Sequence, residues 1–333
     1  MKKIITIMLV LLTILTTILI SGCTVDTVDT APLEKITITE GQQPIGALVY
    51  IAFENGYFTE QGLEVIFQNH FSGKSGLNAV LEGKADIANV ANTPIGFNVL
   101  KGNDVSIIST IGTSTKAIAV LALKDKGISV PSDLKNKKIG VTLGTNGEFF
   151  LNVFLTVHGL TINEVELVNT APTEMYNELL EGRVDAVSAW NPHIGTIQSG
   201  FGDKVITFFD EDIYTLSWNL AGTSEFVNNN PEKIEKITRA LVKAEEFVKN
   251  NPAEAITLVA NFLQLDEEKL KEDWTTYSIE ATLKQTLLLG LEDQSRWAIE
   301  NNLTDAKEIP NYLDYIYMDA LEKVKPEAVT IIR

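Results

Sequence analysis

Apolar and polar residues follow one another along this chain in a regular order. Short apolar runs typical of buried strands recur between residues 36 and 222, and segments with the 3.6-residue spacing of helices separate them. Strands that alternate with helices predict an α/β fold with mainly parallel sheets, because parallel strands need a crossover connection. The predicted strands span residues 36–39, 63–68, 85–90, 105–111, 117–123, 138–143, 165–168, 184–189, 204–208 and 218–222.

From residue 230 onward the pattern is helical. Helices are expected to begin at Asn230-Pro231 and Asn251-Pro252, since Asn is a favoured N-cap and Pro suits the first helical position. The last helices, near residues 283–299 and 312–324, are expected to pack on the first half of the chain.

Two stretches about a hundred residues apart are nearly the same. Residues 78–95 read NAVLEGKADIANVANTPI and residues 177–194 read NELLEGRVDAVSAWNPHI, with seven identities in eighteen ungapped positions. Each copy is a helix end, a Gly, an apolar strand and a polar loop that opens another helix. Such units also recur by chance in α/β proteins, but this degree of identity favours two similar lobes. Loops at the carboxyl ends of such strands face a crevice, where α/β folds bind ligands.

The N-terminus has the pattern of a secretory signal. Met1-Lys2-Lys3 is followed by an uncharged, mostly apolar run and then by Ser21-Gly22-Cys23. The last four residues of this segment resemble the lipobox of prokaryotic lipoproteins, in which the Cys is acylated. We therefore expect a signal peptide at residues 1–22, lipidation at Cys23 and a tether at residues 23–34. The alternative is an uncleaved membrane anchor, since the apolar run is nearly long enough to span a bilayer.

Charge and cysteine content narrow the function further. The net charge is −17 and becomes more negative when Lys2 and Lys3 leave with the signal, which argues against nucleic acid as a partner. Cys23 is the only cysteine of the chain, so no internal disulfide can form.

Four loops are candidates for a small-molecule site because each opens a helix and presents backbone N–H groups. Such helix starts bind anions without any basic side chain. Trp190-Asn191, at the end of a strand in the second copy, is the fifth candidate. The predicted ligand-binding residues are Gln42, Gln43, Ser72, Gly73, Asn92, Thr93, Gly144, Thr145, Asn146, Trp190 and Asn191.

Several of these side chains have a second interpretation. Thr145-x-x-Glu148 fits a capping box, so Thr145 either caps its helix or contacts the ligand, and Glu148 is expected to be structural. Lys74 either points at the ligand or lies in solvent. Trp190 either forms a flat wall of the site or belongs to the core.

The sequence shows few of the residue patterns that are typical of enzymes. The chain has three histidines and no motif of a serine hydrolase or zinc enzyme. His70 and Ser72 share a loop but have no acid to orient the base. We expect no catalytic residues, no metal and no cofactor.

The chain resembles the substrate-binding proteins of ABC importers, in the group that handles nitrate, sulfonates, taurine and thiamine pyrimidines. The resemblance covers roughly residues 35–230. The segments that carry it are ITITEGQQP, FENGYF, FSGKSGLNAVLEGKADIANVANTPI, KKIGVTLGTNGEFFLNVFLTVHGL and LLEGRVDAVSAWNPHI.

This resemblance implies a two-lobe fold of the type II periplasmic-binding-protein kind, with crossover strands near residues 117–125 and 214–222. Lobe I would comprise residues 35–120 and 218–333, and lobe II residues 121–217. The lobes would close on the ligand, and a membrane permease with its ATPase subunits would recognise the closed form. The protein would act as a monomer, lipid-anchored on the extracytoplasmic face.

Three ligand or function classes follow. The first is a small oxoanion: an organosulfonate such as taurine or an alkanesulfonate, or nitrate. The second is an aromatic heterocycle such as a thiamine-precursor pyrimidine, stacked on Trp190 with Phe71 as the second ring. The third is an enzyme or sensory domain of the same fold. Sulfonate-binding members often carry Gly-Asp-Thr-Pro where this chain has Ala91-Asn92-Thr93-Pro94, and the Asn removes a negative charge that an amine could use. The related pyrimidine-synthesising enzymes carry a Cys cluster, which a chain with one Cys cannot have. A sensory role would need a following transmembrane segment, which this sequence does not show before Arg333.

Overall fold

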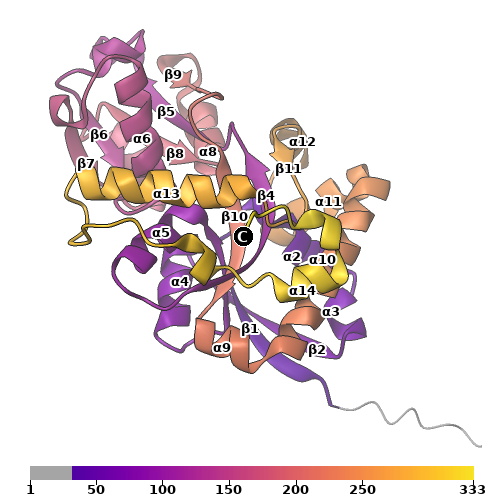
Figure 1. Cartoon of the computed structure of the whole chain (residues 1–333). Coiled ribbons are helices and arrows are strands. Elements are labelled where there is room, and N and C mark those ends of the chain that lie inside the picture. The colour runs from indigo at the N-terminus through magenta and orange to yellow at the C-terminus, as the bar shows by residue number, and fades with distance from the viewer. Residues whose placement is uncertain (1–31) are drawn as a thin grey trace, which may run out of the picture. The chain divides into compact units, whose positions relative to one another are not determined.

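The computed structural model describes residues 32–333 (Figure 1). The predicted signal peptide, Cys23 and nearly all of the predicted tether lie outside the described residues. The chain divides into a unit of residues Met1–Leu33 and a compact unit of residues Glu34–Arg333, and the second unit is described below. No helix within residues 32–333 has the length and apolar character needed to span a membrane.

One sheet of the compact unit has six strands in the order β11-β4-β10-β3-β1-β2. Strand β1 pairs in parallel with β2 and β3, whereas β10 pairs antiparallel with β3 and β4. Both β3 and β10 are buried along their whole length, as expected for central strands with continuous apolar runs. The strands are β1 (Glu34–Glu40), β2 (Leu63–Asn69), β3 (Ile87–Ala91), β4 (Ser106–Ser114), β10 (Leu216–Gly222) and β11 (Tyr277–Ser278).

The other sheet has five strands in the order β7-β6-β8-β5-β9. Strand β6 pairs in parallel with β7 and β8, and β5 pairs antiparallel with β8 and β9. The strands are β5 (Ile118–Leu123), β6 (Lys138–Val141), β7 (Glu166–Asn169), β8 (Ala186–Trp190) and β9 (Val205–Phe208). We call the six-stranded sheet with its helices lobe I and the five-stranded sheet with its helices lobe II.

The chain passes between the two sheets twice. Strand β4 of the first sheet leads into β5 of the second, and β9 of the second leads back into β10 of the first. These passages confirm the two crossover strands predicted near residues 117–125 and 214–222. Three strands in each sheet are parallel, as the alternating pattern predicts, but the crossover strands are antiparallel to their neighbours.

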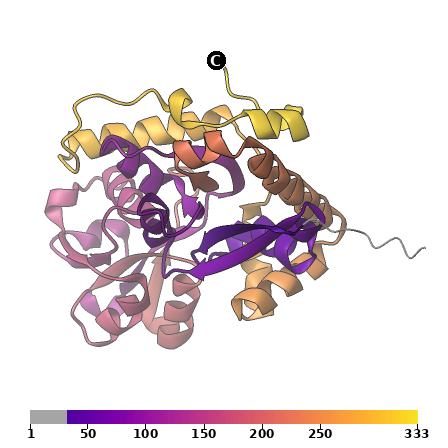
Figure 2. The same cartoon turned by 90° about the horizontal axis from the view of Figure 1, so that it is seen from below.

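Helices cover both sheets, and the C-terminal ones extend along them. Helix α13 packs on α5, and its Trp297 meets Phe149 of α6 edge-on at 5.2 Å between ring centroids. Figures 1 and 2 show α13, in orange, lying alongside both helices. The helices are α2 (Ala47–Glu54), α3 (Tyr57–Glu60), α4 (Gly73–Leu81), α5 (Asn92–Leu100), α6 (Asn146–Val157), α7 (Met175–Leu180), α8 (His193–Phe201), α9 (Ser224–Asn229), α10 (Pro231–Asn250), α11 (Pro252–Leu263), α12 (Glu267–Trp274), α13 (Gln285–Glu300) and α14 (Asp319–Val324).

The sequence repeat is also a structural repeat. In each copy a glycine with positive φ ends the helix, at Gly83 (70°) and Gly182 (68°). In each copy an aspartate three residues later then binds the neighbouring parallel strand. The carboxylate of Asp86 accepts from Thr37 N at 2.7 Å, and that of Asp185 accepts from Lys138 N at 2.9 Å. The two copies therefore occupy equivalent places in the two sheets.

Candidate functional site

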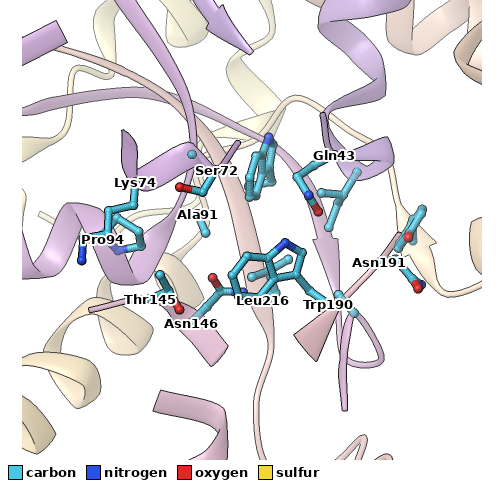
Figure 3. A pocket seen from close by; sticks show the side chains of 15 residues that line it. Gln43, Ser72, Lys74, Ala91, Pro94, Thr145, Asn146, Trp190, Asn191 and Leu216 are labelled. Atoms are coloured by element: carbon cyan, nitrogen blue, oxygen red, sulfur yellow. The ribbon is translucent and has the colours of Figure 1, made fainter. Parts of the chain in front are cut away.

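A narrow pocket lies between the two lobes, where the loops predicted from the sequence meet (Figure 3). Lobe I contributes loops before α2, α4 and α5, and lobe II contributes the start of α6 and the end of β8. The residues that line the pocket are Gln43, Ile45, Ser72, Gly73, Lys74, Ala91, Pro94, Ala117, Thr145, Asn146, Trp190, Asn191, Leu216, Trp218 and Tyr277.

The start of α4 forms one polar edge of the pocket. Ser72 is the N-cap, and its Oγ accepts from Ser75 N at 3.3 Å. Gly73 follows because the helix lies very close to β3: a Cβ there would come within 3.0 Å of Val90 Cα. The first N–H groups of α4 have no partner within the helix, so they remain available to a ligand.

Lys74 makes a contact that neither interpretation of the sequence included. Its Nζ donates to the carbonyl of Leu143, in the β6–α6 loop of lobe II, at 2.7 Å. A Cβ on Gly144 would come within 2.8 Å of this Nζ, so the lysine lies directly on that glycine. Burial, with a smaller contribution from Lys101, lowers the pKa of Lys74. Lys74 thus links the lobes at one flank of the pocket.

A second lysine links the lobes at the opposite flank. Lys269 of α12 lies against Gly195 of α8, where a Cβ would overlap its side chain. Both residues line a separate groove of about 340 Å³ that shares Asn191 with the pocket.

The start of α6 forms the polar edge on lobe II. Thr145 Oγ1 accepts from Gly147 N at 3.2 Å and donates to Thr142 O at 2.7 Å, and Thr145 also lines the pocket. Thr145 therefore caps α6, as one interpretation predicted, and ligand contact by its side chain stays a prediction. Glu148 is structural, as expected, although it accepts from Gly144 N at 2.6 Å rather than from Thr145 N. Burial raises the pKa of Glu148.

Gln43 spans the pocket, whereas Gln42 does not line it. In the amide orientation that satisfies both atoms, Gln43 Nε2 donates to Asn191 O at 2.8 Å and Oε1 accepts from Trp190 Nε1 at 3.2 Å. Figure 3 shows Gln43 and Trp190 facing each other. Gln42 is exposed and has a φ of 55°.

Three aromatic side chains line the pocket, and one of them was predicted. Trp190 is 6% exposed, so it belongs to the core, and it also forms part of the pocket wall. Trp218 and Tyr277 are the other two. Phe71, the ring that the sequence offered as a partner of Trp190, is 59% exposed and is not part of the lining.

The structure places Asn92 and Thr93 behind the pocket wall. Asn92 is 2% exposed and its Oδ1 accepts from the hydroxyl of Tyr214 at 2.8 Å, while Thr93 is 1% exposed. Their neighbours Ala91 and Pro94 form the wall instead. Burial raises the pKa of Tyr214 far above its ordinary value, so this hydroxyl stays a neutral donor.

The pocket is close to neutral in charge. Lys74 is the one charged side chain among the described residues that line it. Within residues 32–333, no group of three or more His, Cys, Asp or Glu side chains is placed to hold a metal ion.

Comparison with known proteins gives a consistent result. The model of the NMT1/THI5-like family matches residues 43–255, which is more than half of the chain. A Bacillus subtilis protein, provisionally named an aliphatic sulfonates-binding protein, is 28% identical over 232 residues, covering 68% of this chain and 69% of that protein. Riboflavin-binding protein RibY of Chloroflexus aurantiacus is 24% identical over 273 residues, covering 74% and 73%.

Among solved structures, the alkanesulfonate-binding protein SsuA of Xanthomonas axonopodis pv. citri, bound to MOPS, superposes with a TM-score of 0.75. The identity is 15%, over 86% of this chain and 99% of that one. This likeness establishes the fold, a two-lobe binding-protein architecture.

Proposed function

Because the chain belongs to the NMT1/THI5-like family, we propose that it is the extracytoplasmic substrate-binding component of an ABC import system. Its ligand is a small oxoanion with a carbon body, an organosulfonate such as taurine or an alkanesulfonate, ahead of nitrate. The observation that carries this proposal is the pocket itself, in which two helix N-termini adjoin an apolar, aromatic wall.

The polar side of the pocket suits an anionic head group. The starts of α4 and α6 contribute Ser72, Gly73, Thr145 and Asn146 to the lining. Each helix start has N–H groups without intrahelical partners and about half a positive charge. A sulfonate between them would be bound by neutral donors, so no arginine is needed.

The apolar side of the pocket favours a sulfonate over nitrate. Trp190, Trp218, Tyr277, Ile45 and Leu216 offer surface that nitrate, with no carbon, cannot cover. Burying one CH₂ contributes about 0.8 kcal/mol, which is roughly a fourfold gain in affinity. The name of the Bacillus subtilis relative points to the same ligand class.

A second candidate ligand is an aromatic heterocycle, such as a thiamine-precursor pyrimidine. The observation that favours it is the presence of three aromatic side chains around one pocket, because stacking binds flat rings. The riboflavin-binding relative supports this candidate.

Transport also requires partners and a location. We propose that residues 35–120 with 218–333 and residues 121–217 close as two lobes on the ligand. The closed form is then recognised by a permease with its ATPase subunits. Lipidated Cys23 anchors the protein, a monomer, to the membrane surface through acyl chains worth about 0.8 kcal/mol per buried CH₂.

An enzyme or sensory domain is the alternative from another class, since one fold hosts many functions. The sequence relatives named above are binding proteins. Incubation with each candidate ligand, followed by chromatography, tests for turnover: product formation would support an enzyme.

The proposal is tested by thermal shift on the purified full chain. The compounds are benzenesulfonate, hexanesulfonate, taurine, nitrate, an aminopyrimidine and riboflavin. A ligand at 100 times its dissociation constant stabilises by about 2.7 kcal/mol, which raises the unfolding midpoint by several degrees. A shift with sulfonates supports the proposal, and a shift confined to the heterocycles supports the second candidate. No shift with any anion would contradict an oxoanion ligand.

A further inference from the structure

A buried carboxylate lies beneath the turn that carries Gln43. Glu40, the last residue of β1, is 2% exposed. A buried carboxylate costs stability unless it is hydrogen-bonded, so its partners indicate what it is for.

The partners of Glu40 all belong to the turn or to its support. Its Oε1 accepts from the backbone N–H of Gln42 and from the hydroxyl of Tyr50, and the N–H of Gln43 also contributes to holding the charge. Tyr50 is fully buried and stacks on Phe262 with ring centroids 4.7 Å apart. Its hydroxyl also lies 3.2 Å from Gln43 O. The carboxylate and the phenol thus hold the turn together.

The turn needs such support because its backbone is unfavourable. Gln42 has a φ of 55°, in the left-handed region that non-glycine residues avoid. The chain just after the turn is packed closely against the sheet, since a Cβ on Gly46 would come within 2.8 Å of Asn89 Nδ2 and 3.1 Å of Trp218 Nε1. An acceptor for the Gln42 N–H compensates for the strained conformation.

The conformation of the turn decides where Gln43 points. Its side-chain amide reaches Trp190 Nε1 and Asn191 O of lobe II. We propose that Glu40 is a positioning residue of the pocket: it holds the Gln42–Gln43 turn in the conformation that lets Gln43 bridge the two lobes. This inference rests on the proposed function, because it takes the pocket as the ligand site.

If Glu40 positions the turn, replacing it should loosen the turn without lowering the unfolding midpoint, whereas replacing a residue that only stabilises the fold should lower the midpoint. Burial raises the pKa of Glu40, so the ionised carboxyl lowers the stability of the folded chain relative to a neutral one. Glu40→Gln removes that charge and leaves one neutral oxygen acceptor where the carboxylate offers two charged ones, so the N–H groups of Gln42 and Gln43 can no longer both bind a charged oxygen. We therefore expect a looser turn and weaker lobe closure with an unchanged or higher unfolding midpoint.

Two measurements test this in the full chain. Hydrogen exchange of the backbone amides in residues 41–46 should be about tenfold faster in Glu40→Gln, because a hydrogen bond to a charged acceptor is lost. Spin labels on Glu54→Cys and Asp203→Cys, both exposed, report the distance between the lobes in a Cys23→Ser background. The population at the shorter distance should fall in Glu40→Gln, with and without benzenesulfonate. Glu34→Gln, an exposed change on the same strand, is the matched control and should leave both measurements unchanged.

The outcomes separate this inference from the proposed function. Unchanged exchange in residues 41–46 would overturn it. So would faster exchange with a midpoint lowered by several degrees, since Glu40 would then be a structural residue only. Faster exchange at an undiminished midpoint supports it even if benzenesulfonate fails to bind the unmodified protein. That failure would count against the sulfonate ligand alone.

Discussion

The two copies of the repeated unit, residues 78–95 and 177–194, share their frame and differ at the pocket. Gly83 and Gly182 end their helices in the same conformation, and the two aspartates bind equivalent strands. The copies differ at the last residue of each strand, where Ala91 of β3 corresponds to Trp190 of β8. The pocket is thus lined by a small Ala side chain from lobe I and by a large indole ring from lobe II.

The matched asparagines show the same difference. Asn92 is enclosed behind the wall and accepts from Tyr214, whereas Asn191 lines the pocket and its backbone carbonyl accepts from Gln43. The glycines and aspartates of the frame have the same role in both copies, whereas the asparagines beside the pocket have different roles. Sequence identity between the copies therefore identifies the frame better than it identifies ligand contacts.

Trp190→Ala is the change with the largest expected effect, because it makes the second copy resemble the first at the pocket wall. Loss of a buried aromatic contact of 2–3 kcal/mol should weaken benzenesulfonate affinity roughly a hundredfold by calorimetry. Phe71→Ala is the control, since Phe71 is exposed and should not change the affinity. Equal losses in the two variants would show that the wall of the site lies elsewhere.

The shared frame is tested by Asp86→Ala and Asp185→Ala. Each change leaves one strand N–H without its acceptor, so each should lower the free energy of unfolding by about 1–2 kcal/mol. Denaturant titration measures both. If one variant lost far more stability than the other, the two aspartates would not be equivalent.

The asparagine pair should respond in opposite ways. Asn92→Ala removes the acceptor of the Tyr214 hydroxyl and should lower stability by about 1 kcal/mol, with little change in ligand affinity. Asn191→Ala removes a side-chain oxygen that is buried without a hydrogen-bond partner within residues 32–333, so stability should fall less than in Asn92→Ala while benzenesulfonate affinity falls by up to about tenfold. Calorimetry and denaturant titration on both variants decide, and parallel behaviour of the two would contradict the distinction.

The smallest effect is expected from Lys74→Met. Lys74 lies in the first turn of α4, the helix that leads into the first copy, and its Nζ contacts Leu143 O at one flank of the pocket. The same offset of 99 residues places Thr173 before the second copy, and Thr173 is not among the residues that line the pocket. Loss of this partly exposed contact, worth about 1 kcal/mol, should speed benzenesulfonate dissociation about fivefold in stopped flow. Lys101→Met is the control, and an equal change there would indicate a general charge effect.

Much of the fold could be predicted from the sequence because the apolar periods are strong. All ten predicted strands are present, and the helices that begin at Pro231 and Pro252 are as expected. The Asn side chains before those helices behave differently from the prediction. Asn230 donates to Phe226 O and Asn251 to Phe247 O, so each closes the preceding helix rather than capping the next.

The pocket was harder to predict, because it depends on residues far apart in the sequence. The loops at helix starts meet there, since helix starts carry local signals such as Ser72 and Thr145. Tyr277 gave no such signal: its strand has two residues and forms only by pairing with β4. The sequence also does not show that the Trp218 side chain would point from β10 into the pocket, or that Lys74 would contact Leu143. Both depend on how the two sheets are placed together.

The lysines on the two flanks of the pocket affect how long a ligand stays bound, through the rate at which the lobes separate. Lys74 lies on Gly144 and Lys269 on Gly195, one on each side of the enclosed space. Separation of the lobes, which a molecule held between them would need in order to leave, would break both contacts. The residence time of such a molecule is then governed by the rate at which the lobes separate, and a partner that pulls them apart can release even a tightly held cargo at once.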